Sequence, residues 1–308
     1  MKMLINKLMK ILFLFMFISC DGEIDNYQIP PHNPEVEKKH VFLIGLDGWG
    51  SYSFENENFS MPAIKKIIDN GSYTLQVLNV MPSISLPNWS SMLMGASPDI
   101  TGYWTNNSSE AVSEIVDTYG LFPSIFTLLK KQKPECKAAF FYEWDTNGFL
   151  CPDNVIDNKQ YISNLSKDIS IVTDYIKTER PNFCFIMIDE PDHVGHNIGY
   201  NTPAYYEELN RLDGLITQII LSIKDSGIWD NSILMFSSDH GGVGNGHGGD
   251  TPSERYVPFI VFGSNIKKGT LISQDVMIYD IAPTIAYFFE LEIPIFWEGS
   301  VINVVNNN

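Results

Sequence analysis

Short runs of apolar residues alternate along this chain with longer stretches in which apolar and polar residues are mixed. The runs predict strands over residues 40–46, 73–80, 136–142, 182–188, 232–237 and 256–263. The mixed stretches predict helices over residues 62–69, 87–93, 124–132, 166–178, 204–226 and 279–289. Because the runs are apolar at successive positions, they are typical of parallel strands buried on both faces. The alternation predicts an α/β fold, with a mainly parallel central sheet flanked by helices on both faces.

Acidic residues lie just beyond the carboxyl ends of three predicted strands. Asp47 follows the first strand, Asp192 follows the strand at 182–188, and Asp239 follows the strand at 232–237. Ligands of open α/β sheets bind beyond the carboxyl ends of the strands. We therefore expect these residues to converge on one edge of the sheet.

Two motifs near these strand ends carry the side chains that suit a metal. The motif EPDHVGH at 190–196 offers Asp192 and His196, and SSDHGGVGNGHGG at 237–249 offers Asp239, His240 and His247. Carboxylate oxygens and neutral imidazole nitrogens are preferred zinc ligands. The glycines allow tight turns and a close approach of the backbone to an ion. These motifs predict a metal site; the alternative is a set of polar loops that only cap the sheet.

A candidate nucleophile lies in the segment PSISLPNWSSMLMG at 82–95. Ser85 would stand between the second strand and a helix beginning at Pro87, where developing negative charge is favoured. Serine is a poor nucleophile at neutral pH, and coordination to a dication is one way to activate it. Ser83 is the nearest competitor, and either serine alone fits a turn.

Composition narrows the classes of function. The chain has 308 residues, is 44% hydrophobic and 13% aromatic, and so is not typical of a disordered protein. Its net charge of -17 argues against nucleic acid or an anionic membrane surface as a partner. In an enzyme for anionic phosphates, bound dications would reverse this charge locally.

The N-terminus is typical of a targeting segment. Lysines and an apolar core at 11–18 lead to Ser19-Cys20, which predicts a lipoprotein signal peptide over 1–19 with Cys20 as the lipidated first residue. An ordinary signal peptide is the alternative. Residues 21–38 read as a tether, and 39–308 as a single catalytic domain. We expect an exported protein, attached to a bacterial membrane only through its lipid, on the periplasmic or cell-surface side.

Three further cysteines follow, an odd number that does not indicate a disulfide framework. Cys184 lies in the run FCFIMID and is predicted to be a buried small hydrophobe. Cys136 and Cys151 would be able to pair in an oxidising compartment, which the sequence leaves open.

Several motifs together resemble the type I phosphodiesterase/nucleotide pyrophosphatase family of the alkaline phosphatase superfamily, over about residues 40–263. LDG matches the family's first metal-binding aspartate, here Asp47, and SLPN matches a TFPN pattern whose first residue is the nucleophile, here Ser85. GYWTNN matches the segment whose asparagine contacts the phosphoryl group, here Asn106. The remaining ligand patterns match PDHVGH, SDHG and GHGGD.

The resemblance implies a site for two Zn²⁺ ions, with other divalent metals as alternatives. One ion would be held by Asp192, His196 and His247, and the other by Asp47, Ser85, Asp239 and His240. The resemblance further implies hydrolysis of phosphodiesters or nucleotide pyrophosphates through a phosphoserine intermediate. The Asn106 amide and the Ser85 backbone N–H would hold a non-bridging oxygen of the small phosphate-ester substrate.

Departures from the family pattern keep a second activity open. Serine replaces the threonine common among the diesterases and is usual in phosphomonoesterases, so a phosphomonoesterase is the alternative. The chain also leaves little room for a large nucleotide-pocket insert. Trp104, and Tyr142 and Trp144 in the aromatic-rich stretch at 140–149, are the candidates for contacting the leaving group; core and rim packing is their alternative role.

Two other readings fit less well. Sulfatases carry a C/S-x-P-x-R pattern, and Trp89 stands where that arginine is required. A non-catalytic surface lipoprotein that binds ligands through this fold would tend to lose metal ligands or the nucleophile, whereas every matching position is filled here.

Overall fold

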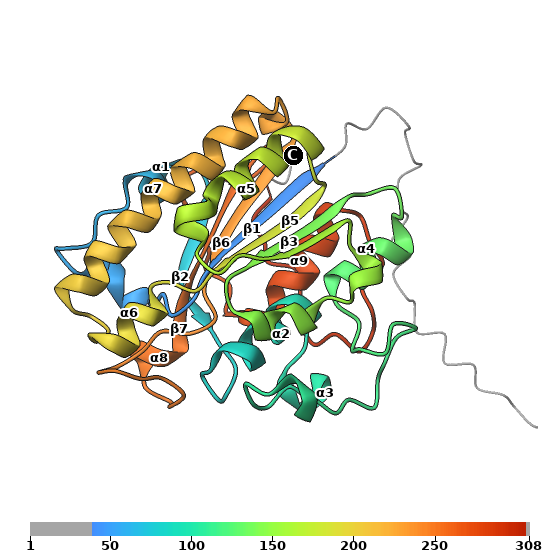
Figure 1. Ribbon diagram of the computed structural model, residues 1–308, viewed down its shortest axis with the longest axis horizontal. Helices are drawn as coiled ribbons and strands as arrows, with labels where there is room; N and C mark the ends of the chain where they lie inside the picture. Colours follow the sequence, from blue (N-terminus) through green and yellow to red (C-terminus); the bar gives the residue numbers. More distant parts are fainter. Residues whose placement is uncertain (1–38, 306–308) are drawn as a thin grey trace, which may run out of the picture. The chain divides into compact units, whose positions relative to one another are not determined.

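A nine-stranded sheet organises residues 39–305, the part of the chain that the computed structural model describes. Its strands are β1 (His40–Leu46), β2 (Ser72–Leu78), β3 (Ala138–Tyr142), β4 (Asn158–Tyr161), β5 (Phe183–Ile188), β6 (Ser232–Ser237), β7 (Tyr256–Gly263), β8 (Thr270–Leu271) and β9 (Val276–Met277). The strand order is β4-β3-β5-β1-β6-β7-β2-β8, with β9 paired to β2. Figure 1 shows β3, β5, β1 and β6 side by side in this order. The predicted signal peptide, the lipidation site Cys20 and the tether lie outside the described residues.

The sheet is mainly parallel, as the sequence predicts. Strand β1 pairs in parallel with β5 and β6, and β3 pairs in parallel with β5 and β4. Only β7 is reversed among the long strands, because it is antiparallel to both β6 and β2. Strand β2 therefore runs in the direction of β1, and its carboxyl end lies at the same edge as those of β1, β5 and β6.

The reversal of β7 follows from the connection that precedes it. Residues 238–255 join β6 to β7 and contain only one short helix, α8 (Pro252–Arg255). No long crossover helix carries the chain back to the other edge, so β7 begins where β6 ends. The sequence motif with the candidate ligands Asp239, His240 and His247 occupies this connection, which keeps all three at one edge.

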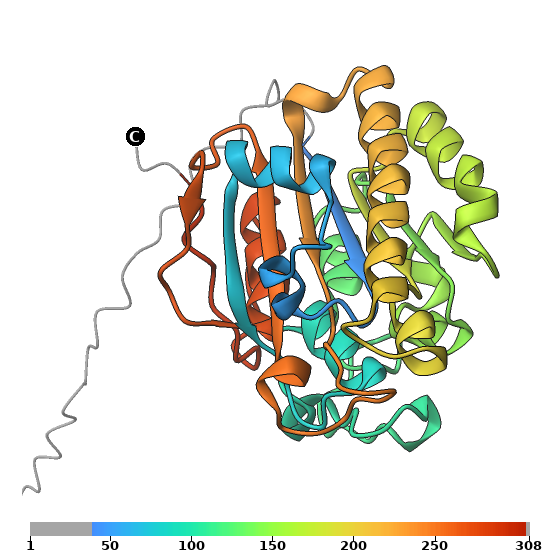
Figure 2. The ribbon, with the colours of Figure 1, turned by 90° about the vertical axis from the view of Figure 1, so that its left-hand side faces the viewer.

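Helices cover both faces of the sheet (Figures 1 and 2). The remaining α-helices are α1 (Pro62–Asn70), α2 (Ser85–Met94), α3 (Pro98–Thr101), α4 (Ile125–Gln132), α5 (Leu165–Glu179), α6 (Asp192–Asn197), α7 (Pro203–Asp225) and α9 (Ile281–Phe288). Residues of α2, α4 and α9 form one buried cluster with Val41 and Leu43, while residues of α1, α5 and α7 form another with Phe42 and Ile44. Successive residues of β1 thus serve opposite faces, as strand geometry requires.

Most of the predicted elements agree with the structure to within two residues at each end. The helix predicted to start at Pro87 starts at Ser85, which places the serine in the helix itself. A proline is tolerated throughout a first turn, because its missing N–H has no intrahelical partner there. The short elements β4, β8, β9, α3 and α6 were not predicted, since each is too brief to show a period.

Two further features are the state of the cysteines and the length of the helices. Cys151 is a buried free thiol, so it is not bridged to Cys136, and Cys184 is buried in β5 as predicted. Between residues 39 and 305, no helix has the length and apolar character needed to cross a membrane.

Candidate active site

One edge of the sheet gathers the candidate ligands. Asp47 directly follows β1, Asp192 begins α6 after β5, and Asp239 follows β6. The backbone N–H of Asp192 donates to the Asp47 carbonyl at 3.0 Å, which joins the ends of β1 and β5. Gly48 allows this approach, because a Cβ there would lie 2.9 Å from Asp192 atoms and its φ of +73° favours glycine.

A first group of possible ligands is fully buried. It consists of Asp47, Asp239 and His240, whose ligand atoms all lie within 4.8 Å of one another. His240 Nε2 is 3.2 Å from Asp239 Oδ2 and 3.5 Å from Asp47 Oδ1. The same nitrogen lies 3.2 Å from Ser85 Oγ. The four residues that the family resemblance assigns to one ion thus surround a single imidazole nitrogen.

A second group shares that imidazole. Asp192, His240 and His247 also have ligand atoms within 4.8 Å of one another. His196 lies beside them, with Nε2 3.2 Å from Asp192 Oδ2 and 3.1 Å from His247 Nε2. The His240 and His247 rings are stacked, with centroids 3.7 Å apart. The structure therefore brings together the expected set of Asp192, His196 and His247, and adds His240 as a neighbour of both groups.

The three histidines share one orientation. Each ring directs Nδ1 at a backbone carbonyl oxygen: His196 at Asn245 (3.0 Å), His240 at Gly241 (2.9 Å) and His247 at Ser83 (2.9 Å). A carbonyl only accepts hydrogen bonds, so Nδ1 carries the hydrogen and a neutral ring leaves the Nε2 lone pair toward the cluster. Metal-binding histidines are held in this way, with the second nitrogen donating to a fixed acceptor.

Each of the three carboxylates has one oxygen held by an uncharged donor. The pairs are Trp89 Nε1 to Asp47 Oδ2 (3.1 Å), Gly48 N to Asp239 Oδ1 (3.2 Å), and the Tyr200 hydroxyl to Asp192 Oδ1. The other oxygens of Asp47 and Asp239 are buried and accept no hydrogen bond from the described residues. Such orphaned oxygens are costly unless a cation compensates them, so the donor set fits metal ions.

The shifted pKa values of the clustered carboxyl and imidazole groups also favour a bound positive charge. Burial, together with the neighbouring carboxylates, raises the pKa of Asp47 and of Asp239 well above their usual range. Burial and nearby His247 lower the pKa of His240 to about 3, so this ring is neutral. The hydrogen bond to Asp192 raises the pKa of His196 to about 9. Without an ion, the proton on His196 supplies positive charge at neutral pH.

Ser85 occupies the amino end of α2, next to these groups. Among the first-turn positions of this helix, the Leu86 N–H donates to Asn106 Oδ1 at 2.9 Å, and Pro87 has no N–H. The Asn88 N–H bonds back to Ile84 at 3.4 Å. Within the described part of the chain, the Ser85 N–H has no acceptor, which leaves one free amide donor beside Ser85 Oγ.

The loop before Ser85 is fixed by the Asn88 side chain. Asn88 Oδ1 accepts from Val80 N at 2.7 Å, and its Nδ2 donates to the carbonyls of Val80, Pro82 and Ile84. Ser83, the competing serine, donates its hydroxyl to the Gly249 carbonyl at 2.9 Å. Ser83 therefore links two loops, whereas Ser85 Oγ contacts the buried imidazole.

Asn106 lies beside the nucleophile. Its Oδ1 accepts from the Leu86 N–H, which leaves its amide nitrogen available as a donor.

The three aromatic candidates for leaving-group contacts lie in different places. Trp104 is 47% exposed. Tyr142 instead stacks near Phe140 in the core, and it lines a cavity of about 370 Å³ that includes none of the candidate ligands. Trp144 packs half-buried against the same core. Tyr142 and Trp144 lie away from the candidate ligands because β5 separates β3 from β1 in the sheet.

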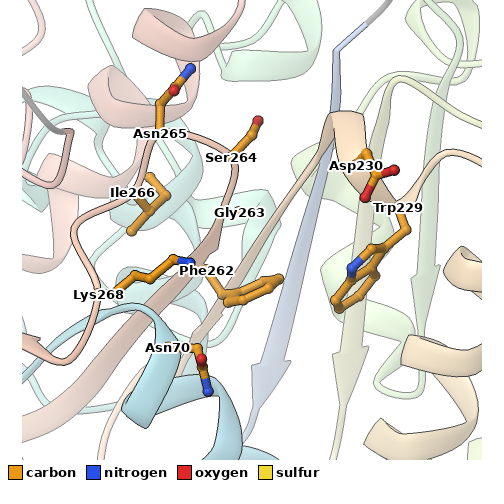
Figure 3. A pocket seen from close by; sticks show the side chains of 9 residues that line it. All are labelled: Asn70, Trp229, Asp230, Phe262, Gly263, Ser264, Asn265, Ile266 and Lys268. Atoms are coloured by element: carbon orange, nitrogen blue, oxygen red, sulfur yellow. The ribbon is translucent and has the colours of Figure 1, made fainter. Parts of the chain in front are cut away.

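A second cavity, of about 420 Å³, lies away from the cluster. Figure 3 shows its lining, in which the Trp229 and Phe262 rings face the gap together with Lys268. Trp229 precedes β6, while the ligands follow β6, so this cavity belongs to the opposite edge of the sheet.

Three supporting residues were not identified from sequence. Trp89 lies in an apolar stretch of α2 that reads as core, Asn88 reads as a helix residue, and Tyr200 stands in a loop after Gly199. Asn88 ends the SLPN motif, but the motif does not reveal that its side chain holds the loop at 80–84. Trp89 and Tyr200 belong to no motif, and Trp89 acts on Asp47, which is 42 positions earlier in the chain.

The family model and the similar curated proteins all carry phosphodiesterase or pyrophosphatase names, or the name of a triphosphatase. The model of the family "Type I phosphodiesterase / nucleotide pyrophosphatase" matches residues 41–251. Ectonucleotide pyrophosphatase/phosphodiesterase family member 1 of Mus musculus is 23% identical over 236 residues, which cover 72% of this chain and 26% of that protein. Human bis(5'-adenosyl)-triphosphatase ENPP4 is 23% identical over 252 residues, covering 76% of this chain and 53% of that protein.

Solved structures share the fold. An inactive variant of murine ectonucleotide pyrophosphatase/phosphodiesterase 5, in complex with AMP, gives a TM-score of 0.69 at 16% identity and covers 84% of this chain and 96% of that chain. A 2-O GAG sulfatase gives a TM-score of 0.71 at 13% identity, covering 86% of this chain and 73% of that chain. These likenesses establish the alkaline phosphatase-like architecture.

Proposed function

The chain belongs to the type I phosphodiesterase/nucleotide pyrophosphatase family, and we propose that it is a metal-dependent hydrolase of phosphodiesters or nucleotide pyrophosphates. One observation carries the proposal: Ser85 Oγ lies at a helix start, 3.2 Å from the Nε2 of the buried His240. The names of the relatives, and the AMP bound to the murine neighbour, support a small nucleotide-like phosphate ester as substrate.

Two zinc ions fit this site. Asp47, Ser85, Asp239 and His240 would hold one ion, and Asp192, His196 and His247 would hold the other. The support is the shared Nδ1 orientation of the three imidazoles and the orphaned oxygens of Asp47 and Asp239. When bound, zinc would activate a hydroxyl and neutralise charge on the transferring phosphoryl group.

The residues of the chain define a two-step route. Ser85 Oγ forms a bond to phosphorus while the leaving group departs, and water then cleaves the phosphoserine. The free Ser85 N–H and the Asn106 amide nitrogen donate to a non-bridging oxygen. The amino end of α2 favours the negative charge that accumulates there. Asn88 and Leu86 keep the nucleophile and Asn106 in register.

Substrate preference tests the proposal. We expect purified protein to hydrolyse bis-p-nitrophenyl phosphate with a higher kcat/KM than p-nitrophenyl phosphate, and Ser85→Ala protein made in the same way should hydrolyse both at least about 10³-fold more slowly. A preference for the monoester would instead support the phosphomonoesterase alternative, which the serine nucleophile keeps open. Hydrolysis of p-nitrophenyl sulfate is not expected, because Trp89 donates to Asp47 where a sulfatase needs arginine.

Zinc binding is expected to strengthen as pH rises. The pKa of His196, at about 9, means that this ring in the ion-free site holds a proton at neutral pH, and the raised pKa values of Asp47 and Asp239 act in the same direction. Zinc must displace this proton, so affinity should increase up to about pH 9 as competition from protons weakens. Chelator-competition titrations between about pH 6 and 8 would measure the change. An affinity independent of pH over that range would contradict the protonation described here.

A further inference from the structure

We infer that Tyr200 is a positioning residue for one metal ion, because its hydroxyl fixes the carboxylate of Asp192. The inference rests on the proposed zinc site and assigns a role to a residue that is not itself a ligand. It states that Tyr200 raises the affinity of the ion held by Asp192, His196 and His247, and leaves the other ion unaffected.

Among the candidate ligands, Tyr200 makes its hydrogen bond and ring contacts with Asp192, His196 and His247. Its hydroxyl donates to Asp192 Oδ1, while Asp192 Oδ2 faces His196 Nε2 at 3.2 Å. The Tyr200 ring stands edge-on to the rings of His196 and His247, with centroids 6.1 and 6.5 Å away. One side chain thus touches all three residues assigned to this ion.

Helix α6 and the loop after β6 enclose the Tyr200 ring. A Cβ on Gly195 or on Gly242 would fall 2.5 Å from atoms of this ring, so both glycines leave space that the ring fills. The Tyr200 N–H donates to the Gly244 carbonyl at 2.8 Å. The ring is 4% exposed. Because the ring is packed between α6 and this loop, its hydroxyl is held as a donor to Asp192.

The chemistry of the donor suits this role. A tyrosine hydroxyl has an ordinary pKa of about 10, so it is an uncharged donor at neutral pH. An uncharged donor orients the carboxylate and leaves its negative charge for the metal, whereas a lysine would neutralise it. Trp89 serves Asp47 in the same way from the other side of the cluster. Outer contacts of this kind typically change metal affinity by about 10–100-fold.

Tyr200→Phe removes only the hydroxyl, and Tyr206→Phe is its matched control. Tyr206 is buried nearby, but its hydroxyl donates to Asn201 Oδ1 at 2.6 Å and touches no ligand. In chelator-competition titrations we expect Tyr200→Phe to bind one of two zinc ions about 10–100-fold more weakly. The second ion, and both ions in Tyr206→Phe, should bind as in the unmodified protein.

Two further backgrounds assign the effect to one ion. His247→Ala protein should lack the ion assigned to Asp192, His196 and His247. In this background, adding Tyr200→Phe should not weaken binding of the remaining zinc ion. Asp239→Ala protein should lack the ion assigned to Asp47, Ser85, Asp239 and His240. In this background, Tyr200→Phe should still weaken zinc binding. Unchanged affinity for both ions in Tyr200→Phe, or equal loss at both, would overturn the inference. These titrations measure zinc binding and not hydrolysis, so their outcome does not depend on diesterase activity. If the unmodified protein binds no zinc, both this inference and the proposed function are wrong.

Discussion

Ser85→Ala is expected to lower kcat by at least about 10³-fold while the protein remains folded. The hydroxyl is the proposed attacking group, and its only hydrogen-bond contact among residues 39–305 is His240 Nε2, at 3.2 Å. The backbone bonds that start α2 do not involve this side chain, so its loss leaves the helix intact. A residual rate would reflect a water molecule positioned by the remaining site, as in other enzymes that lack their nucleophile. Steady-state kinetics with a chromogenic diester would measure the loss.

Neighbouring variants separate chemistry from structure. Ser85→Thr retains a hydroxyl at the same position and should keep substantial activity. Ser83→Ala loses a bond to Gly249 and should remain active, because that hydroxyl joins two loops and does not contact the imidazole. Phosphopeptide mass spectrometry after an acid quench during turnover should find phosphate on Ser85. Phosphate on Ser83, or full activity in Ser85→Ala, would show that the nucleophile is wrongly assigned.

The strand order explains which parts of the site were predictable from sequence. The runs that became β1, β5 and β6 are apolar at nearly every position because both faces are covered, and this pattern is local. Asp47, Asp192 and Asp239 follow those strands directly, so the rule that ligands gather at carboxyl ends was enough to place them together. The motif resemblance then selected Ser85 over Ser83, which spacing alone left open.

Other features depend on contacts between segments and leave no local signal. Tyr142 and Trp144 were plausible pocket residues, but β5 lies between β3 and β1 and directs them to the core. The sharing of His240 between two groups arises from its stacking on His247, seven residues away along a glycine-rich loop. Tyr200 acts only because Gly195 and Gly242 make room for its ring. The lipidation of Cys20 stays a prediction.

His240→Ala is expected to remove the ion that Asp47, Ser85, Asp239 and His240 would hold, because a neutral ring with Nδ1 bonded to the Gly241 carbonyl has one lone pair, on Nε2, and binds one ion. His240 Nε2 lies within 4.8 Å of the ligand atoms of both groups, and the ring is completely buried. Its loss would leave Asp47 and Asp239 facing each other without a neutral ligand between them, which raises the cost of keeping both ionised. Hydrolysis should fall to the background rate, and the melting temperature should rise less on addition of zinc than it does in the unmodified protein.

Zinc content per chain, measured by elemental analysis after dialysis, distinguishes this outcome from a general loss of structure. His247→Ala and Asp239→Ala should each retain about one ion, because each residue belongs to one group only. His193→Ala, in the same motif as Asp192 but with an exposed side chain, should retain both ions and serves as the control. If His240→Ala protein still held two zinc ions per chain, His240 would not be a ligand, and its assignment to the buried group would be wrong.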